Sequence, residues 1–473
     1  MKDKYFISQR LGFTNAQAES IENVGLSHFL ERSFNTSPNV EMPSFLVNAP
    51  KTRKEYREFK QLTEENKKLV GVMEVFRNNG TAHWWIQKMA TDEFPLREKM
   101  VLFWHNHFTS SYQKVKSSWA MFQQNQLFRD NTFGNFKELT RLILYDNAMI
   151  TYLDNIQNKV GSPNENLSRE LLELFTLGIG NYTERDVKEG ARALAGLNLD
   201  DAHGAYIKRW EDDGEKTYLG ASGNLKADQM VDIIFSHPKA AHRITEKLLK
   251  HFVTSTPSPR DIDKYAAVLR NNNFEIQPFL KVLLTSDYFL KSQSNLVKDP
   301  LSFLLQLLYE FQLSVPPQRY LVPYFQQQGF VLLNPPNVKG WDGGRDWLSS
   351  QKLIQRMSLV HTIAGGKELE AYKLKAKKEA ASAQADMELK HEFDTAYLNS
   401  ETPAIRWNKN KESTSAKIIS SFCAQFLIHD DEDTKKSLEG ILRYDFDPNT
   451  PNAEKTVSLL AENLLKLPEF QII

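Results

Sequence analysis

Two histidines lie two residues apart in the segment REKMVLFWHNHF, at His105 and His107. Imidazole nitrogens are common zinc ligands, and on a strand both rings would face one side, where they could share a metal ion. Apolar residues at helical spacing in the same segment favour a helix, on which the two rings would point about 200° apart. Two hypotheses stay open: the histidines bind a metal if the helix ends near Trp104, and otherwise they are a core-edge residue and a helix cap.

Two carboxylates, Glu170 and Glu173, lie three residues apart in the segment NENLSRELLELF. On a helix this spacing places both on one face, together with Asn166, as carboxylate metal sites and acid–base pairs require. We therefore predict that His105, His107, Glu170 and Glu173 are catalytic. The same four residues are the candidate ligands of a divalent metal cofactor.

The same segment supports a structural alternative. Glu165, Arg169 and Glu173 recur every four residues, which is the spacing of a salt-bridge ladder worth roughly a few tenths of a kcal/mol per pair. Leucines flank Arg169 on the helix. We therefore expect its guanidinium to be largely buried and paired with Glu165 or Glu173.

Two further segments offer binding residues. The turn WEDDGEK contains Asp212 and Lys216. Its oxygens suit a hard cation, but it lacks the spacing and closing glutamate of an EF-hand, so an ordinary turn is the favoured interpretation. The loop NPPNVKGWDGGRDW contains Trp341 and Trp347, whose indoles can stack on a sugar or peptide or, more commonly, fill a core. The full set of predicted binding residues is Asn106, Asn164, Glu165, Asn166, Arg169, Asp212, Lys216, Trp341 and Trp347.

Helices are the elements that must position these residues, because apolar side chains recur at three- and four-residue steps through most of the chain. Thr183 and Asp186 have the spacing of a capping box, and Ser236 before His237 and Pro238 predicts a helix start. Strand patterns and hairpin turns are scarce. The predicted fold class is all-α: a large multi-helix body with irregular loops and at most a small peripheral sheet, with helices over 97–104, 165–176, 184–195 and 238–252.

Composition along the chain predicts three regions. Residues 1–365 form a helical body, and the periodic residues 413–473 are expected to be C-terminal helices that pack back on it. Between them, residues 366–412 are predicted to be a charged, exposed insertion or linker. Its first part, Lys367–Asp394, contains 6 Lys and 7 Asp+Glu in 28 residues and few large apolar side chains.

The overall composition excludes several classes of protein. The 59 Lys+Arg balance 59 Asp+Glu, so no nucleic-acid partner is expected. The single Cys423 cannot form an intrachain disulfide or a cysteine-rich metal site. No apolar run approaches the roughly 18–20 residues of a membrane span. The first residues lack the apolar core of a signal peptide, so we expect a cytoplasmic protein, or a periplasmic one if the native N-terminus was trimmed.

Five segments resemble motifs of the bacterial DUF1800 family and follow one another in the family's order. They are REKMVLFWHNHF, NENLSRELLELFTLGIGNYTERDVKEGARALAG, DDGEKTYLG, HPKAAHRITEKLLKHFV and NPPNVKGWDGGRDW. The function of this family is unknown. The resemblance implies a largely helical bacterial protein. Members of the family are often encoded beside a protein of a second, sulfatase-like family. One departure is Glu211, where family members often have a histidine. The motif positions that the resemblance carries over are His105, Asn106, His107, Asn164, Glu165, Asn166, Arg169, Glu170, Glu173, Asp212, Gly214 and Lys216.

Two functional hypotheses follow. In the first, the chain is a soluble bacterial protein with a polar His/Asn/Glu cluster between helices, acting as a metal-dependent hydrolase. A histidine would then lie beside Glu170 and Glu173, with residues 212–216 and 340–347 lining the same hollow, because polar groups near a core must find partners. In the second, the chain is a non-enzymatic partner or assembly factor for a co-encoded sulfatase-like protein, and the cluster is a structural clamp.

Overall fold

The computed structural model describes residues 2–60, 62–365, 403–409, 412, 414–428, 431–442 and 446–473. Helices account for most of these residues. Within this part of the chain, strands form two antiparallel pairs, β1 (Leu197–Asn198) with β2 (Ala205–Tyr206) and β3 (Lys216–Tyr218) with β4 (Ala221–Gly223). The predicted all-α class with a small sheet is therefore confirmed. Much of the predicted 366–412 insertion lies outside the described residues, and the division into three regions stays a prediction.

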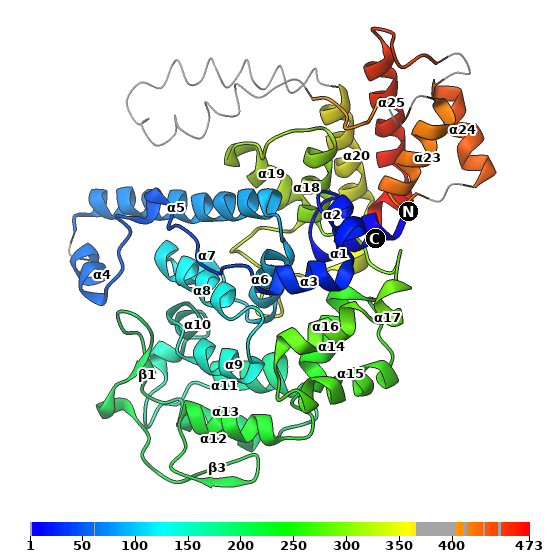
Figure 1. Cartoon of the computed structure of the whole chain (residues 1–473). Helices are drawn as coiled ribbons and strands as arrows, with labels where there is room; N and C mark the ends of the chain where they lie inside the picture. Colours follow the sequence, from blue (N-terminus) through cyan, green and yellow to red (C-terminus); the bar gives the residue numbers. More distant parts are fainter. Residues whose placement is uncertain are drawn as a thin grey trace.

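The N-terminal helices lead into one long helix, α5 (Glu64–Thr91). Thr63 caps it by accepting a hydrogen bond from the Asn66 amide at 3.3 Å. Figure 1 shows α5 running inward from α4 at the edge of the molecule. The elements before α5 are α1 (Lys2–Leu11), α2 (Ala18–Val24), α3 (Leu26–Phe34), η1 (Ser44–Leu46) and α4 (Arg53–Lys60).

The next helix, α6 (Leu96–His107), lies in the interior of the body. Every one of its residues except Asn106 is buried, as expected only for a helix that is covered on all sides. It packs against α3, α5 and α8. The elements that follow it are α7 (Tyr112–Val115), α8 (Ser118–Asp130), α9 (Phe136–Leu144), α10 (Asn147–Tyr152) and η2 (Asn155–Gln157).

A fully buried ion pair joins α6 to α8. The Arg129 guanidinium donates two hydrogen bonds to the Glu98 carboxylate, each at 2.8 Å, and neither side chain is exposed to solvent. The Trp85 indole of α5 donates a third hydrogen bond to the same carboxylate, at 2.8 Å. Neither charge contacts solvent, so removing one of the two leaves the other in the core without its main partner.

A π-helical turn interrupts the helix that carries the carboxylate motif. α11 (Asn166–Glu170) continues directly into η3 (Leu171–Thr176), which is a π-helix. The following helix, α12 (Glu184–Ala193), begins at the predicted capping box of Thr183 and Asp186. π-helical turns are rare and are found frequently at functional sites. A short 3₁₀ turn, η4 (Lys208–Trp210), lies between β2 and β3.

The predicted helix start at Ser236 is wrong. Ser236 is the last residue of α13 (Ala227–Ser236), and α14 (His242–Phe252) begins only after a turn over residues 237–241. The cause is Pro238, because a proline disfavours helical backbone at the residue before it. His237 accordingly has an extended ψ of 137° and ends α13.

The two ends of the chain lie side by side (Figure 1). Arg10 donates a hydrogen bond to the Ile473 carbonyl at 2.5 Å, and α1 packs against α23 (Ser415–Gln425). α25 (Ala453–Leu465) packs against α20 (Ser350–Gly365). The remaining elements are α15 (Pro259–Asn271), α16 (Ile276–Leu284), α17 (Asp287–Leu290), α18 (Pro300–Glu310), α19 (Gln318–Gln328), η5 (Gly344–Leu348), α24 (Glu432–Leu442) and η6 (Pro468–Gln471).

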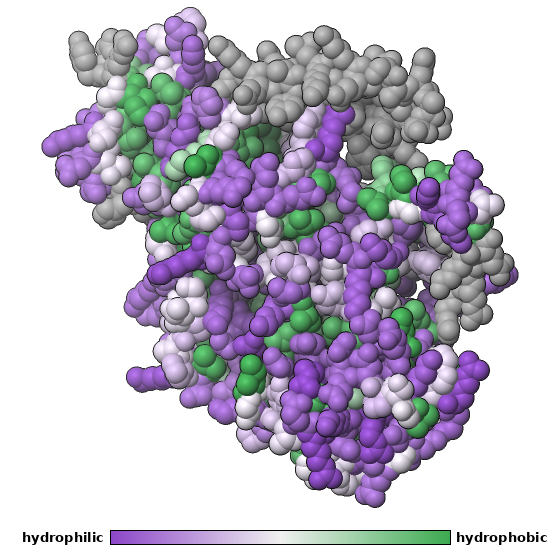
Figure 2. Space-filling model, turned by 180° about the vertical axis from the view of Figure 1, so that it is seen from behind, coloured by the Kyte–Doolittle hydropathy of each residue, from purple (hydrophilic) through white to green (hydrophobic). Residues whose placement is uncertain are grey.

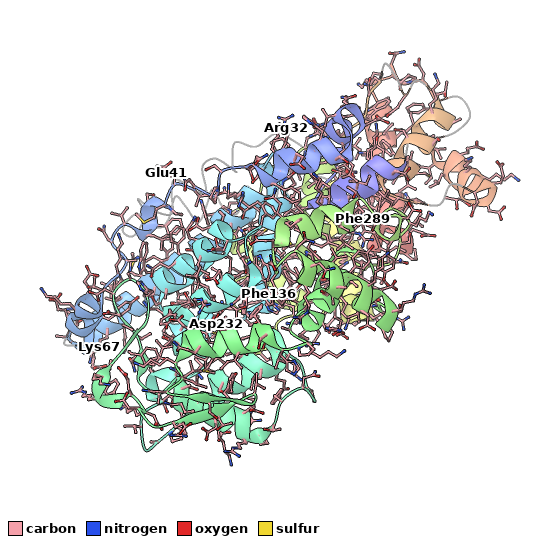
Figure 3. All side chains as sticks on the ribbon, turned by 60° about the horizontal axis from the view of Figure 1, so that its bottom comes forward. Arg32, Glu41, Lys67, Phe136, Asp232 and Phe289 are labelled. Carbon is pink, nitrogen blue, oxygen red and sulfur yellow. The ribbon has the colours of Figure 1, made fainter. Side chains whose placement is uncertain are left out.

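The face of the molecule drawn in Figure 2 is mainly hydrophilic, with hydrophobic side chains in small separate groups. Figure 3 shows Phe136 inside the body, where it is 0% exposed, and Lys67 near its edge. Among the described residues, no helix is long and apolar enough to cross a membrane.

Replacing Arg129 by Met should lower the free energy of unfolding by about 3–5 kcal/mol, because the buried Glu98 carboxylate would keep only the Trp85 indole and the more distant Lys88 ammonium, at 4.0 Å, as partners. The control is Arg169→Met, which removes ion pairs from a side chain that is 33% exposed and should cost less than about 1 kcal/mol. Denaturant unfolding followed by circular dichroism measures both. Equal losses in the two variants would contradict a structural role for the buried pair.

Candidate functional site

His105 points into an aromatic cage. Its ring centroid lies 5.8 Å from that of Trp85, 6.5 Å from that of Phe128 and 5.7 Å from that of Trp341, and the residue is 1% exposed. Its Nε2 makes no hydrogen bond to any residue that the structure describes. Burial lowers the pKa of His105 to about 4, so the imidazole is neutral at pH 7.

His107 lies in a second aromatic cage, and it too is 1% exposed. Burial, followed by the positive charges of Lys247 and Arg243, lowers the pKa of His107 well below the usual value of a histidine. The Phe175 carbonyl opposes this shift, but neither ring nitrogen makes a hydrogen bond of ordinary geometry. The aromatic rings around it belong to Phe103, Trp104, Phe108, Phe136 and Phe175.

The predicted four-residue metal site is not assembled. Within the described ranges, no three His, Cys, Asp or Glu side chains are grouped so that they could hold a metal ion. The reason is that α6 remains helical through His107, which directs the two imidazoles to different sides of the helix. His105, His107, Glu170 and Glu173 therefore do not form a donor set that fits a divalent metal.

Asn106 anchors the predicted tryptophan loop to α6. Its Oδ1 accepts a hydrogen bond from the Trp341 amide at 2.8 Å. Gly340 has φ +89° and packs so closely that an added Cβ would overlap Asn106 Oδ1 and lie 2.7 Å from the Asn106 carbonyl oxygen. Trp341 stacks on Phe330 at 4.4 Å, and Trp347 meets the same ring edge-on at 6.0 Å. Trp341 therefore covers His105, and Trp347 packs beside it on the Phe330 ring.

Glu170 and Glu173 are both half-buried, one just before the π-helical turn and the other within it. Burial, followed by the charge of Glu173, raises the pKa of Glu170, while the positive charges of Arg169 and Lys339 partly oppose the shift. The Tyr182 hydroxyl donates a hydrogen bond to Glu173 at 2.9 Å. One carboxyl group is thus held by a tyrosine while the other is shifted toward its protonated form, as acid–base pairs require.

Arg169 is paired as predicted but is not largely buried. Its guanidinium donates to Glu165 at 3.0 Å and forms two hydrogen bonds with Glu184, at 2.7 and 2.8 Å. These ion pairs raise the pKa of Arg169 above its usual value. It is less buried than expected because the leucines of this segment cover the inner face, which leaves the Arg169 side chain 33% exposed. Glu173, its other candidate partner by spacing, bonds Tyr182 instead.

The two asparagines of the motif shape the start of α11. Asn164 Oδ1 accepts a hydrogen bond from the Asn166 amide at 3.0 Å, and the Asn164 amide donates to Asn158 Oδ1 at 3.1 Å. The Asn166 side chain donates to Asp154 at 3.5 Å. Both residues therefore fix the backbone that leads into Glu170.

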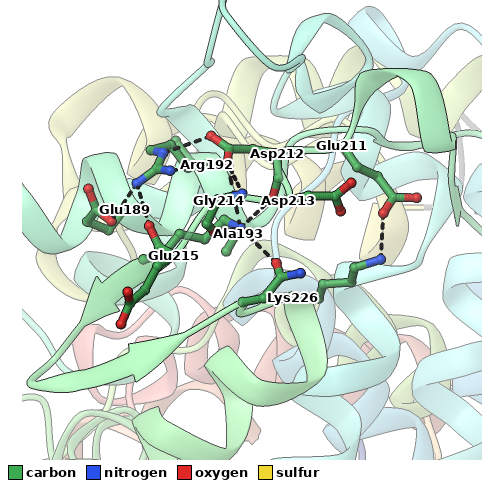
Figure 4. A network of polar contacts seen from close by, with 12 residues as sticks. Glu189, Arg192, Ala193, Glu211, Asp212, Asp213, Gly214, Glu215 and Lys226 are labelled. Atoms are coloured by element: carbon green, nitrogen blue, oxygen red, sulfur yellow. Dashed lines mark hydrogen bonds and ion pairs between the residues drawn. The ribbon is translucent and has the colours of Figure 1, made fainter.

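The acidic turn belongs to a separate network (Figure 4). Asp212 accepts two hydrogen bonds from Arg192 of α12, at 2.8 and 3.1 Å. These bonds lower the pKa of Asp212; burial opposes the shift, and the Gly214 amide adds to it. The Lys216 ammonium, which is 0% exposed, donates to the carbonyls of Asp212 and Gly214 and to Asn224. Asp212 and Lys216 thus hold the turn against α12, and their hydrogen bonds do not connect them to the carboxylate pair.

Comparison with known proteins places these motifs in one family. The family model described as a protein of unknown function (DUF1800) matches residues 7–472. The chain belongs to the DUF1800 family. No curated protein and no solved structure matches it.

Two residues that act on the carboxylate pair, Tyr182 and Lys339, could not be predicted from helical spacing in the sequence. Tyr182 comes after the π-helical turn in the sequence, and Lys339 lies far along the chain beside the Gly340 turn. Both reach the pair only through the fold. Lys339 directly precedes Gly340 in the loop that Asn106 anchors, so α6 indirectly positions a charge near Glu170.

Gly340→Ala should destabilise the protein more than Gly344→Ala does. Both glycines have positive φ, so each alanine costs about 1–2 kcal/mol of backbone strain. Gly344 faces open space, whereas Gly340 contacts Asn106, which adds about 1–3 kcal/mol of overpacking. Thermal unfolding, together with the tryptophan fluorescence of the loop, measures the difference. A Gly340→Ala variant as stable as Gly344→Ala would show that the loop is not anchored this way.

Proposed function

We propose that the chain is an enzyme that hydrolyses its substrate by general acid–base catalysis, with Glu170 and Glu173 as the proton-transfer groups. The observation that supports this proposal is the arrangement of the pair at a π-helical turn, where burial, followed by the charge of Glu173, raises the pKa of Glu170. Both carboxyl groups are half-buried, so they combine partial desolvation with access from solvent.

The two carboxyl groups are suited to different steps. Glu173, oriented by the Tyr182 hydroxyl, would accept a proton from the attacking water. Glu170, whose raised pKa keeps a larger protonated fraction, would donate a proton to the leaving group. Lys339 is exposed, and its positive charge acts on Glu170. It would favour negative charge that develops on the substrate.

No step in this proposal uses a metal, because the predicted donor set does not converge. His105 and His107 have no proton-transfer role in it, since both are enclosed by aromatic rings. We assign both histidines to the core. Of the four residues predicted as catalytic, only Glu170 and Glu173 keep a catalytic role in this proposal.

A second candidate function is a non-enzymatic partner for a co-encoded sulfatase-like protein. The observation that favours it is an exposed apolar stripe on α5, formed by Leu69, Val72 and Val75, which are 61%, 65% and 48% exposed. Exposed apolar stripes of this kind are typical of protein-binding surfaces. For either function, we propose the cytoplasm as the location, or the periplasm if the native N-terminus was trimmed.

Glu170→Gln and Glu173→Gln should each lower hydrolytic turnover by about 10²–10⁴-fold, because each variant removes a proton-transfer group. The assay uses the full chain, treated with EDTA, on chromogenic esters, phosphate esters, sulfate esters and glycosides. Glu165→Gln, on the same segment but paired with Arg169, is the matched control and should retain full turnover. Turnover that is equal in all three variants, or present only with added metal, would contradict the proposal.

Glu173→Gln should also move the titration midpoint of Glu170 to lower pH, because it removes a negative charge that raises the pKa of Glu170. Carbon-13 NMR of labelled glutamate side chains measures this midpoint without a substrate. Glu165→Gln again serves as the control. An unchanged midpoint in Glu173→Gln would show that the two carboxyl groups are not coupled.

A further inference from the structure

Lys247, in the middle of α14, is a half-buried cation without a partner. Its ammonium makes no hydrogen bond or ion pair with any described residue, and the helix that carries it packs against α15 and the π-helical turn η3. The neighbouring carboxylate, Glu246, is already occupied: it accepts from Arg243 at 3.2 Å and from Lys250 at 2.6 Å. Lys247 is therefore half-buried with no counter-charge of its own among the described residues.

Arg243 lies one helical turn before Lys247 and also has unused hydrogen-bonding capacity. Its Nε is buried and has no acceptor among the residues that the structure describes. An added Cβ on Gly178, which follows the π-helical turn, would lie 3.8 Å from Arg243 Cδ. α14 packs directly on that turn, and from α6 the ring of His107 responds to the charges of both Lys247 and Arg243. Two cationic side chains thus share one face of α14.

Electrostatics support a chemically active amine at this position. Burial, followed by the positive charge of Arg243, lowers the pKa of Lys247 to about 7. Lys250 adds to this effect, and Glu246 opposes it. A lysine with such a pKa is substantially unprotonated at neutral pH, which makes its nitrogen a nucleophile.

We propose that Lys247 forms an imine with a small carbonyl compound that carries an anionic group, and that Arg243 binds the anionic group. The nitrogen lone pair would attack the carbonyl carbon to give a carbinolamine, which loses water to give the imine. One amine and one carbonyl compound yield one imine and one water, and no oxidant or reductant takes part. This inference does not rest on the Glu170–Glu173 pair.

The test labels the full chain with glyoxylate, an anionic aldehyde, or with acetaldehyde, a neutral one. Cyanoborohydride traps the imine, and peptide mass spectrometry measures labelling at each lysine. Lys250 is the matched control on the same helix, because it is exposed and paired with Glu246. At pH 7, Lys247 should be labelled roughly tenfold or more faster than Lys250, because an unperturbed lysine is almost fully protonated at this pH.

Arg243→Met tests the anionic group separately. In the native chain, glyoxylate should label Lys247 faster than acetaldehyde does, and the preference should be lost in Arg243→Met while the labelling of Lys250 stays the same. If Lys247 in the native chain is labelled no faster than Lys250, the proposal that Lys247 is a reactive amine is overturned, whatever the variant does. An unchanged preference for glyoxylate in Arg243→Met would overturn the role of Arg243. Because trapping does not measure hydrolysis, its outcome is independent of the acid–base proposal.

Discussion

α6 is covered on every side except at Asn106, so the buried charges that it carries can find partners only inside the protein. Glu98 does so with Arg129 and Trp85, at hydrogen-bond distances of 2.8 Å. Lys99 does so with Ser302 of α18, at 3.2 Å. These contacts join α5, α8 and α18 to one helix, so the positions of the surrounding elements depend on the satisfaction of its buried charges.

The same constraint separates packing from chemistry in the motif residues. Asn106, the exception on α6, uses its side chain to hold the loop that places Lys339 near Glu170. His105 and His107 are directed into aromatic surroundings on different sides of the helix. The solvent-accessible polar groups are found instead at the π-helical turn. The histidine-rich segment thus supports the proposed site, whose carboxyl groups come from another helix.

Much of the fold could be predicted from local pattern. Apolar periodicity indicated the helices, and Thr183 with Asp186 correctly marked the start of α12, because capping depends on residues within one turn. The pairing of Arg169 with Glu165 was predictable for the same reason. The start at Ser236 was not, because the effect of Pro238 on its preceding residue outweighed a plausible cap.

The candidate site was less predictable, because its geometry depends on contacts between distant segments. The spacing of Glu170 and Glu173 placed them together, but Tyr182 and Lys339 reach them only through the fold. The buried partner of Glu98 lies on another helix, at Arg129, with no regular spacing to reveal it. Spacing within one segment therefore suggests which groups can act together, but burial and tertiary partners decide which of them do.

The most direct test of this separation is the nitrogen-15 NMR spectrum of the histidine side chains, recorded from pH 7.5 to pH 5 with and without zinc. The signals of His105 and His107 are assigned by their loss in His105→Phe and His107→Phe, since phenylalanine suits an aromatic cage. Because burial lowers the pKa of both imidazoles, they should remain neutral throughout and should not respond to zinc. Protonation of either ring near pH 6.5, or a shift of both on adding zinc, would contradict the assignment of these histidines to the core.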